Sequence, residues 1–177
     1  MKTRVIAPLL LLLSMNAGAA EALTTIPALD VPRYMGTWYE IAKFPNRFQK
    51  QCTGFTKATY SALPSGRVQV VNRCRTDKGE TDEAIGEARQ IGGPTSPKLK
   101  VRFAPAFLSF LPMVWGDYWV IDLDPNYQLA AVSEEKREYL WILARTPTVD
   151  KATYDALVAR LAARGLDVSK LEATRQQ

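Results

Sequence analysis

The 177-residue sequence contains no histidine. Without an imidazole the chain can build neither a Ser-His-Asp triad nor a Cys-His pair, which are common nucleophilic sites of hydrolases. It also lacks a G-x-S-x-G segment, a glycine-rich phosphate-binding loop and a compact acidic motif for a metal. We therefore expect a protein that is not an enzyme and has no cofactor or metal. An enzyme that uses a glutamate or tyrosine as its acid–base group is the remaining alternative.

Long apolar runs are also scarce. Two basic residues precede the apolar stretch Val5–Met15, which is about as long as a secretory h-region and too short to cross a bilayer. Small residues follow, and A-x-A patterns end at Ala19 and Ala22. We expect residues 1–20 to be a signal peptide, cleaved between 19 and 22, and residues 21–177 to form one exported domain. No cysteine stands at the end of this segment to carry an acyl chain, so no lipid anchor is expected.

The charge is mild for a protein of this size. Loss of the leader removes two basic residues and no acid, so the formal net charge falls from +5 to +3. The remaining lysines and arginines are scattered among acids and form no basic stripe, so we expect no nucleic-acid partner.

The chain has only two cysteines, Cys52 and Cys74. In an exported protein an even pair predicts a disulfide, and two free buried thiols are the alternative. Strands expected at Thr53–Ser61 and Arg67–Cys74, joined by a turn at Leu63–Gly66, would bring the cysteines to one end of a hairpin. Their register differs by a few residues, so the pairing requires a bulge. Such a bond is worth roughly 3 kcal/mol.

Most of the remaining sequence consists of short alternating segments separated by turn signals, which is typical of a sandwich or barrel. The stretch Arg75–Glu83 is expected to be a polar loop. Leucines and alanines at helical spacing predict a helix over Lys151–Arg164, capped by Asp150 and ended by Gly165. A short strand is expected in the tail, Lys170–Arg175. The other expected strands are Thr37–Phe44, Ala84–Gln90, Lys98–Phe103, Asp117–Asp124, Tyr127–Ser133 and Glu138–Arg145.

Eight antiparallel strands with short connections, followed by one helix, predict an all-β fold. We expect an eight-stranded antiparallel up-and-down β-barrel with one C-terminal α-helix, because closure removes exposed strand edges. A barrel of eight strands is filled by side chains or holds one small ligand.

Gly36-Thr37-Trp38 lies at the entry to the first of these strands, and an arginine, Arg145, ends the eighth. With these spacings and the helix that follows, the chain resembles the lipocalins. It is most similar to bacterial lipocalins related to outer-membrane lipocalin lipoproteins and to animal apolipoprotein D, in a form without the lipid-bearing cysteine. The resemblance rests on the segments DVPRYMGTWYEIAKFPNRF (30–48), CTGFTKATYS (52–61), VQVVNRCR (68–75), GDYWVIDLDPNYQLAAV (116–132) and YLWILARTPT (139–148).

The resemblance implies that Gly36, Trp38 and Arg145 close the base of the barrel. Trp38 would plug the closed end and the Arg145 guanidinium would lie over its indole, where a cation–π contact contributes on the order of 1 kcal/mol. Gly36 would allow the sharp turn of the backbone, and the preceding segment 30–36 would cross the base as a short helical turn.

Strand parity together with the resemblance predicts the residues that line a cavity. Small residues on the inward face of 84–88 favour a cavity over a filled core, although a packed interior remains the alternative. A carboxylate inside, Glu40, must be paired, hydrated or protonated, so both a structural and a ligand-binding role are open for it. The predicted lining is Glu40, Ala42, Phe44, Tyr60, Leu99, Val101, Phe103, Tyr118, Val120, Tyr139 and Trp141.

The connection 104–116 is unusually apolar and contains Phe107, Phe110 and Leu111. It either packs over the barrel mouth or forms an apolar lip that gates the cavity or contacts a membrane or partner.

The resemblance implies a periplasmic carrier of a small apolar ligand, such as a fatty acid or lysophospholipid, with cationic groups near the mouth for an acidic head group. An envelope-protection or interaction protein that acts through the apolar loop, with peripheral membrane contact, is the alternative. A lipid-modifying enzyme is the less favoured third reading.

Overall fold

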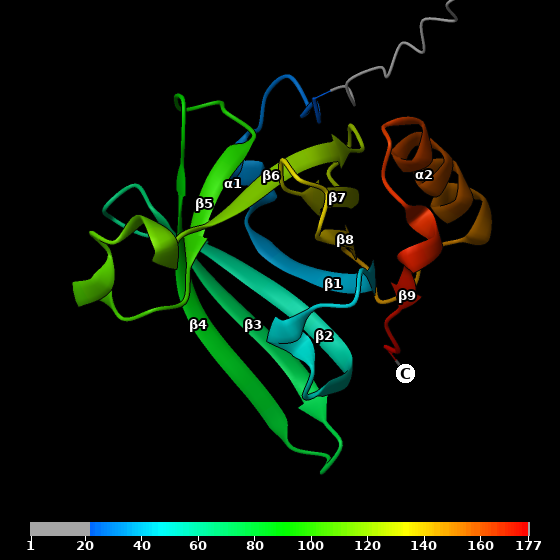
Figure 1. Cartoon of the computed structure of the whole chain (residues 1–177), viewed down its shortest axis with the longest axis horizontal. Coiled ribbons are helices and arrows are strands. Elements are labelled where there is room, and N and C mark those ends of the chain that lie inside the picture. Colours follow the sequence, from blue (N-terminus) through cyan, green and yellow to red (C-terminus); the bar gives the residue numbers. More distant parts are fainter. Residues whose placement is uncertain (1–21, 177) are drawn as a thin grey trace, which may run out of the picture.

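The computed structural model describes residues 22–176, so the predicted signal peptide lies outside the described residues. Nine strands form one antiparallel sheet in the order β2-β3-β4-β5-β6-β7-β8-β1-β9. β1 also pairs with β2, which closes strands β1–β8 into the predicted barrel (Figure 1). The strands are β1 Gly36–Lys43, β2 Cys52–Ala62, β3 Val68–Thr76, β4 Thr81–Gln90, β5 Lys98–Arg102, β6 Gly116–Leu123, β7 Leu129–Ser133, β8 Leu140–Ala144 and β9 Glu172–Ala173.

Two α-helices accompany the barrel. α1 (Val31–Tyr34) lies just before β1, as the expected turn across the base, and Asp30 caps it by accepting a hydrogen bond from the Arg33 amide. α2 (Lys151–Ala163) is the predicted C-terminal helix. Short 3-10 turns complete the chain; they are η1 Arg47–Gln49, η2 Ala106–Leu108, η3 Pro112–Val114 and η4 Val168–Lys170.

The ends of α2 form as their residues predict. The Asp150 carboxylate accepts from the Thr153 amide at the N-terminus. Gly165, with φ +77, ends the helix, because the left-handed conformation lets the Gly165 and Leu166 amides bond back to the last turn. Leu161 is fully buried against the outer face of the barrel.

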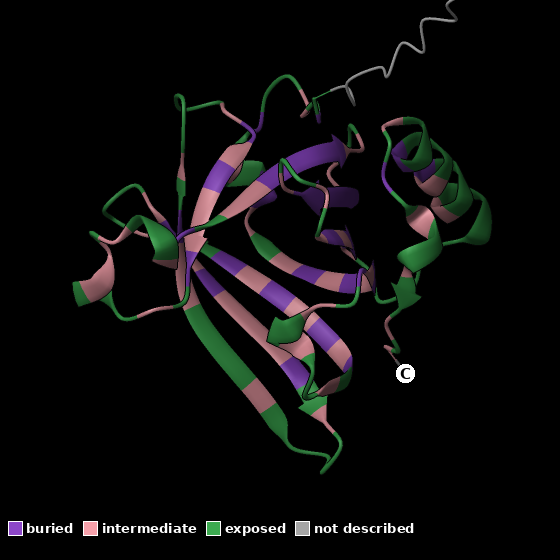
Figure 2. Cartoon of the chain, viewed as in Figure 1, coloured by how far each residue is buried: buried purple, intermediate pink, exposed green. Residues whose placement is uncertain are grey.

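The sheet beneath α2 is therefore buried on both faces. All five residues of β7 are buried, as are four of five in β8. Figure 2 shows this continuous burial next to α2, whereas β2 alternates between buried and intermediate residues. One face of these strands packs in the barrel interior and the other in a second cluster with the helix.

The expected polar loop at Arg75–Glu83 is wrong. β3 continues to Thr76 and β4 begins at Thr81, so the turn between them is only four residues long. Charged residues suit this exposed hairpin because they pair across it, as Arg73 and Glu83 do at 2.5 Å.

A β-bulge in β1 shifts the strand register between Glu40 and Ala42. Trp38 lies in the interior cluster, but beyond the bulge Ala42 and Phe44 lie in the cluster beneath α2. The extra residue reverses which side chains face inward, so the placement of Ala42 and Phe44 in the cavity lining is wrong.

The C-terminal segment lies between β1 and β2 where these strands separate. β1 pairs with β2 only from Gly36 to Tyr39. Further along, the Thr174 amide donates to the Ile41 carbonyl and the Phe55 amide donates to the Arg175 carbonyl. The tail thus bridges the two strands, and Figure 1 shows β9 beside the end of β1. The expected tail strand is confirmed as the two-residue β9.

Candidate ligand-binding site

The closed end of the barrel is built around Trp38, which is fully buried. The Arg145 guanidinium lies 4.0 Å from the centre of its ring. Arg145 also donates to the Thr37 carbonyl at 3.0 Å and to the Arg33 carbonyl at 2.9 Å. Gly36 has φ +95, and a Cβ there would lie 3.2 Å from Arg145 Nη1. The Arg145 side chain therefore links the start of β1 to the end of β8 across the Trp38 indole.

Three tyrosines lie directly above this plug. The Tyr118 hydroxyl is 3.0 Å from the hydroxyls of both Tyr34 and Tyr60, and the Tyr34 carbonyl accepts the Trp38 indole N–H at 2.8 Å. Burial raises the pKa of all three phenols, that of Tyr60 to about 12. They therefore stay neutral through the physiological range and hold the base together by hydrogen bonds.

The inner wall becomes more accessible toward the mouth, and β5 shows this most clearly. Leu99, near the closed end, is 6% exposed, Val101 is half-buried, and Phe103 is 43% exposed. On β8, Leu143 is 5% exposed whereas Trp141 is half-buried. The closed half of the barrel is thus packed, and apolar surface remains available in the open half.

Phe103 differs from the prediction that it lines an enclosed cavity. Its ring packs against the backbone of Gly86, where a Cβ would lie 2.6 Å from Phe103 Cδ1. The absent side chain at Gly86 therefore makes room for this ring and does not leave the empty volume that was expected. Ala131 on β7 lies in the cluster beneath α2 and leaves no space in the interior.

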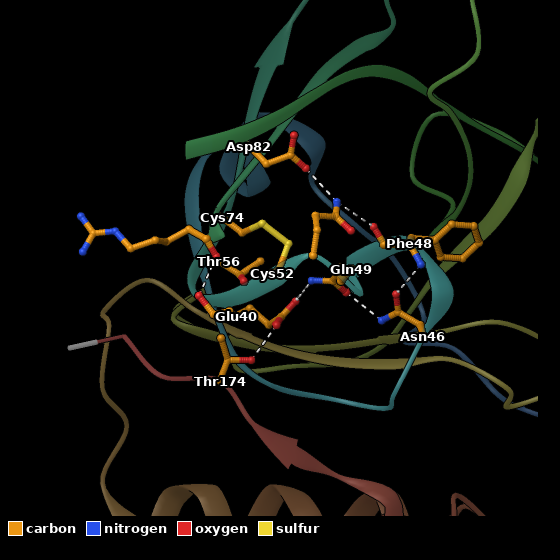
Figure 3. The surroundings of a disulfide bond; sticks show 12 residues. Glu40, Asn46, Phe48, Gln49, Cys52, Thr56, Cys74, Asp82 and Thr174 are labelled. Carbon is orange, nitrogen blue, oxygen red and sulfur yellow. Dashed lines mark hydrogen bonds between the residues drawn. A yellow bond between two sulfur atoms is a disulfide. The ribbon is translucent and has the colours of Figure 1, made fainter. Parts of the chain in front are cut away.

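A polar network lies at the mouth and centres on Gln49 (Figure 3). Its amide nitrogen donates to Glu40 Oε2 at 2.6 Å, and its oxygen accepts from Trp141 Nε1 at 3.0 Å. Glu40 Oε1 accepts from the Thr174 hydroxyl at 2.6 Å. Burial raises the pKa of Glu40, and the hydrogen bonds from Thr174 and Gln49 oppose this shift. The buried carboxyl thus connects β1, the β1–β2 loop and the C-terminal tail.

Aromatic rings stand beside this network. Tyr139 stacks on Trp141, with ring centres 5.8 Å apart, and Phe48 lies 5.5 Å from Tyr139. Phe48 is 55% exposed. An amphiphile that enters the open half would meet these rings first.

The disulfide Cys52–Cys74 is present, with the two Cα atoms 5.5 Å apart. The expected bulge accompanies it, because the β2–β3 register shifts on either side of Gly54. Gln51, next to Cys52 in the sequence, donates to Asp82 on β4 at 2.7 Å. The disulfide and the Gln51–Asp82 hydrogen bond fix the end of the β1–β2 loop to the sheet at the open end of the barrel.

The β5–β6 connection projects from the edge of the barrel (Figure 1) and does not pack over its mouth. Phe107 is 74% exposed and Phe110 is 76% exposed, while Leu111 is half-buried. At the end of the loop, the Arg89 and Arg102 guanidiniums lie over the ring of Trp115, 4.4 and 5.2 Å from its centre.

Arg102 is only 5% exposed, although alternation along the predicted strand 98–103 places it on the face opposite Val101 and Phe103, which would meet water. The loop covers it: Trp115 lies over its guanidinium, and the Ala104 carbonyl accepts from Nη1.

The sequence did not single out several residues of this site. Tyr34 lies two residues before Gly36, in the segment that was expected to cross the base. That position was a signal that could have identified it. Gln49 and Thr174 come from irregular segments whose contacts no periodicity predicts. Within residues 22–176, no three carboxylates or cysteines lie close enough together to hold a metal ion, and no helix is long and apolar enough to span a bilayer.

A closed antiparallel barrel with a plugged base and an accessible inner wall defines the class of eight-stranded barrels that hold one small ligand. Comparison with known families places residues 29–176 in the lipocalin-like domain family. The chain belongs to the lipocalins, in the branch that contains outer-membrane lipocalins and apolipoprotein D. Members of this family bind small hydrophobic ligands.

Several curated relatives match over most of their length. Temperature-induced lipocalin-1 of Arabidopsis thaliana is 42% identical over 158 residues, which are 88% of this chain and 84% of the relative. Outer membrane lipoprotein Blc of Escherichia coli K12 is 39% identical over 151 residues, 85% of this chain and 81% of the relative. Mouse apolipoprotein D is 32% identical over 154 residues, 83% of this chain and 77% of the relative.

Among solved structures, insecticyanin from the tobacco hornworm Manduca sexta superposes with a TM-score of 0.68 at 18% identity. The match covers 89% of this chain and 86% of insecticyanin. At this identity the similarity shows the fold alone.

Proposed function

We propose that the protein carries a single-chain lipid, a fatty acid or lysophospholipid, in the open half of the barrel, within the periplasm. The carrying observation is the rise in exposure along the inner wall toward the mouth, from Leu99 to Val101 on β5 and from Leu143 to Trp141 on β8. Burial of an acyl chain against this wall supplies about 0.8 kcal/mol per methylene. The predicted signal peptide and the similarity to bacterial envelope lipoproteins support the location.

The experiment measures binding of palmitate and 1-palmitoyl-lysophosphatidylcholine to delipidated protein by calorimetry. In the variant Val101→Gln, a polar group lies in the path of the chain, and we expect at least a tenfold loss of affinity because its amide loses water without a partner. The matched control is Ile85→Gln on β4, where the side chain is 57% exposed. If neither lipid binds the wild-type protein, or if both variants behave alike, the proposal is wrong.

A second candidate function is contact with the membrane surface through the β5–β6 loop. Phe107, Phe110 and Met113 are 74%, 76% and 84% exposed, which is unusual for three large apolar side chains within seven residues. Trp115, which contacts the Arg89 and Arg102 guanidiniums through its ring, fixes the end of the loop. Such a surface would let the carrier collect or deliver lipid at a bilayer.

Co-sedimentation with vesicles of phosphatidylethanolamine and phosphatidylglycerol tests this second function. The triple variants Phe107→Ser/Phe110→Ser/Leu111→Ser and Phe107→Ser/Phe110→Ser/Met113→Ser should both lose vesicle binding. Ile85→Ser/Ile91→Ser, which removes exposed apolar side chains elsewhere, should retain it. Equal binding by all four proteins would remove membrane contact from the function.

A further inference from the structure

A basic pocket of about 470 Å³ opens on the outer surface beside the disulfide. It lies between the β1–β2 loop and the C-terminal tail, at the rim of the barrel mouth. Its lining is Lys43, Pro45, Asn46, Arg47, Gln49, Lys50, Cys52 and Glu172.

The charges in this pocket are unbalanced. Lys43 pairs with the one acid in the lining, Glu172, at 3.1 Å. Arg47 and Lys50 form no ion pair with any residue in the described range 22–176; Arg47 rests on the ring of Phe48, 5.1 Å from its centre. Two positive charges are thus left for an external anion, and the guanidinium can engage two oxygens of a phosphate at once.

Gln49 forms the wall between this pocket and the barrel interior. It lines the pocket, yet its side-chain amide bonds to Glu40 and Trp141, which belong to the inner site. A molecule whose chain lies against Trp141 can therefore place its head group in the pocket by passing over Gln49.

The interior itself is unsuited to an anion. At the base, the Arg145 guanidinium already donates to the Thr37 and Arg33 carbonyls. Other polar groups near the mouth and base include the Glu40 carboxyl and the hydroxyls of Tyr34, Tyr60 and Tyr118. The Glu40 carboxyl is only 3% exposed, so a phosphate placed beside it would lose its water without gaining a cation in return. The charge distribution thus orients an anionic amphiphile with its chain inward and its head outward.

We propose that this basic pocket binds the phosphate of a single-chain phospholipid whose acyl chain occupies the barrel. The inference rests on the proposed carrier function and narrows its ligand to amphiphiles with an anionic phosphate head. Arg47 and Lys50 hold the phosphate, Asn46 and Gln49 border the head group, and the Cys52–Cys74 bond fixes the wall of the pocket.

The test compares two lipids that share one chain and differ only in the phosphate, 1-palmitoyl-lysophosphatidate and 1-palmitoylglycerol. Wild-type protein should bind lysophosphatidate at least tenfold more tightly. The variant Arg47→Gln/Lys50→Gln should lose roughly tenfold in affinity for lysophosphatidate, as expected for two partly solvated charge contacts, and less than twofold for palmitoylglycerol. The loss should shrink as salt is raised.

A matched control removes the same net charge elsewhere. Lys57→Gln/Lys151→Gln alters β2 and the first turn of α2, outside the pocket, and should bind lysophosphatidate like the wild type. An equal loss in this control would overturn the inference, because long-range attraction would then suffice. Equal affinity of wild-type protein for the two lipids would overturn it as well.

Two further outcomes separate the head group from a free anion and the inference from the carrier function. If glycerol 3-phosphate binds the wild-type protein as tightly as lysophosphatidate, the pocket is an independent phosphate site and the link to the barrel is wrong. If palmitoylglycerol binds but the phosphate adds nothing, the inference fails and the carrier function stands. If neither lipid nor palmitate binds, the carrier function itself fails.

Discussion

The Arg145 guanidinium lies 4.0 Å from the centre of the Trp38 ring and joins the two ends of the barrel sheet at its base. Replacing Arg145 by glutamine should lower the free energy of unfolding by roughly 2 kcal/mol, because it removes the cation–π contact and leaves three backbone carbonyl groups without their donor. Urea unfolding followed by tryptophan fluorescence measures the change. Arg145→Lys should retain less than half of this stabilisation, since an ammonium lacks the forked donors that reach the Thr37 and Arg33 carbonyls. If Arg145→Gln lowers the free energy of unfolding by less than about 0.5 kcal/mol, the contact between Arg145 and Trp38 does not stabilise the base.

The contact between Gly36 and Arg145 gives a second prediction. Gly36→Ala puts a methyl group 3.2 Å from Arg145 Nη1 and forces alanine to φ +95. Gly66, in the β2–β3 turn, has φ +76 and open space around it, so Gly66→Ala reports the backbone cost alone. We expect losses of roughly 2 kcal/mol at Gly36 and roughly 1 kcal/mol at Gly66. Equal losses would show that the guanidinium moves aside freely.

Alternation of apolar and polar residues predicted every strand of the barrel, because each inward face must be apolar and most outward faces meet water. The base was also predictable, because the placing of Gly36, Trp38 and Arg145 relative to the first and last strands resembles that in lipocalins, and the resemblance implied their closing role. The same pattern failed beyond Glu40. The bulge there adds one residue to β1 without changing the local composition, so nothing in the sequence signalled that Ala42 would turn toward α2.

The mouth was the least predictable part. Its contacts are made by side chains of irregular segments, such as Gln49 from η1 and Thr174 from the tail, and they depend on how separate segments meet in space. Gly86 shows a related limit: an inward glycine indicated space, but the structure fills that space with Phe103. Composition can mark a missing side chain without showing which neighbour replaces it.

Loss of the disulfide should lower the free energy of unfolding. Cys52 and Cys74 are 22 residues apart, and closing a loop of that length stabilises by roughly 3 kcal/mol. Cys52→Ala/Cys74→Ala should lower the unfolding free energy by that amount, and reduction of the wild-type protein should match it. The variant itself should not respond to reductant. A loss below 1 kcal/mol would show that the β2–β3 ladder alone fixes this edge.

Glu40 makes stability depend on pH in a direction opposite to that of most carboxylates. Burial raises the pKa of Glu40 above its ordinary value of 4.5, so between the two values the folded protein binds more protons than the unfolded chain. Its contribution is complete below the unfolded pKa and declines as the pH rises through the folded pKa. Each unit of the shift is worth about 1.4 kcal/mol.

Glu40→Gln keeps hydrogen-bonding groups for Gln49 and Thr174 but cannot ionise. The unfolding free energy of the wild type minus that of Glu40→Gln should therefore fall as the pH is raised from 4 toward 8. The same subtraction for Glu80→Gln, in the exposed β3–β4 turn, accounts for the change in net charge. A difference that stays flat or rises with pH would mean that the Thr174 and Gln49 hydrogen bonds outweigh burial, and that Glu40 is held as a stable carboxylate. In that case the tail would be bound more firmly at neutral pH than in acid.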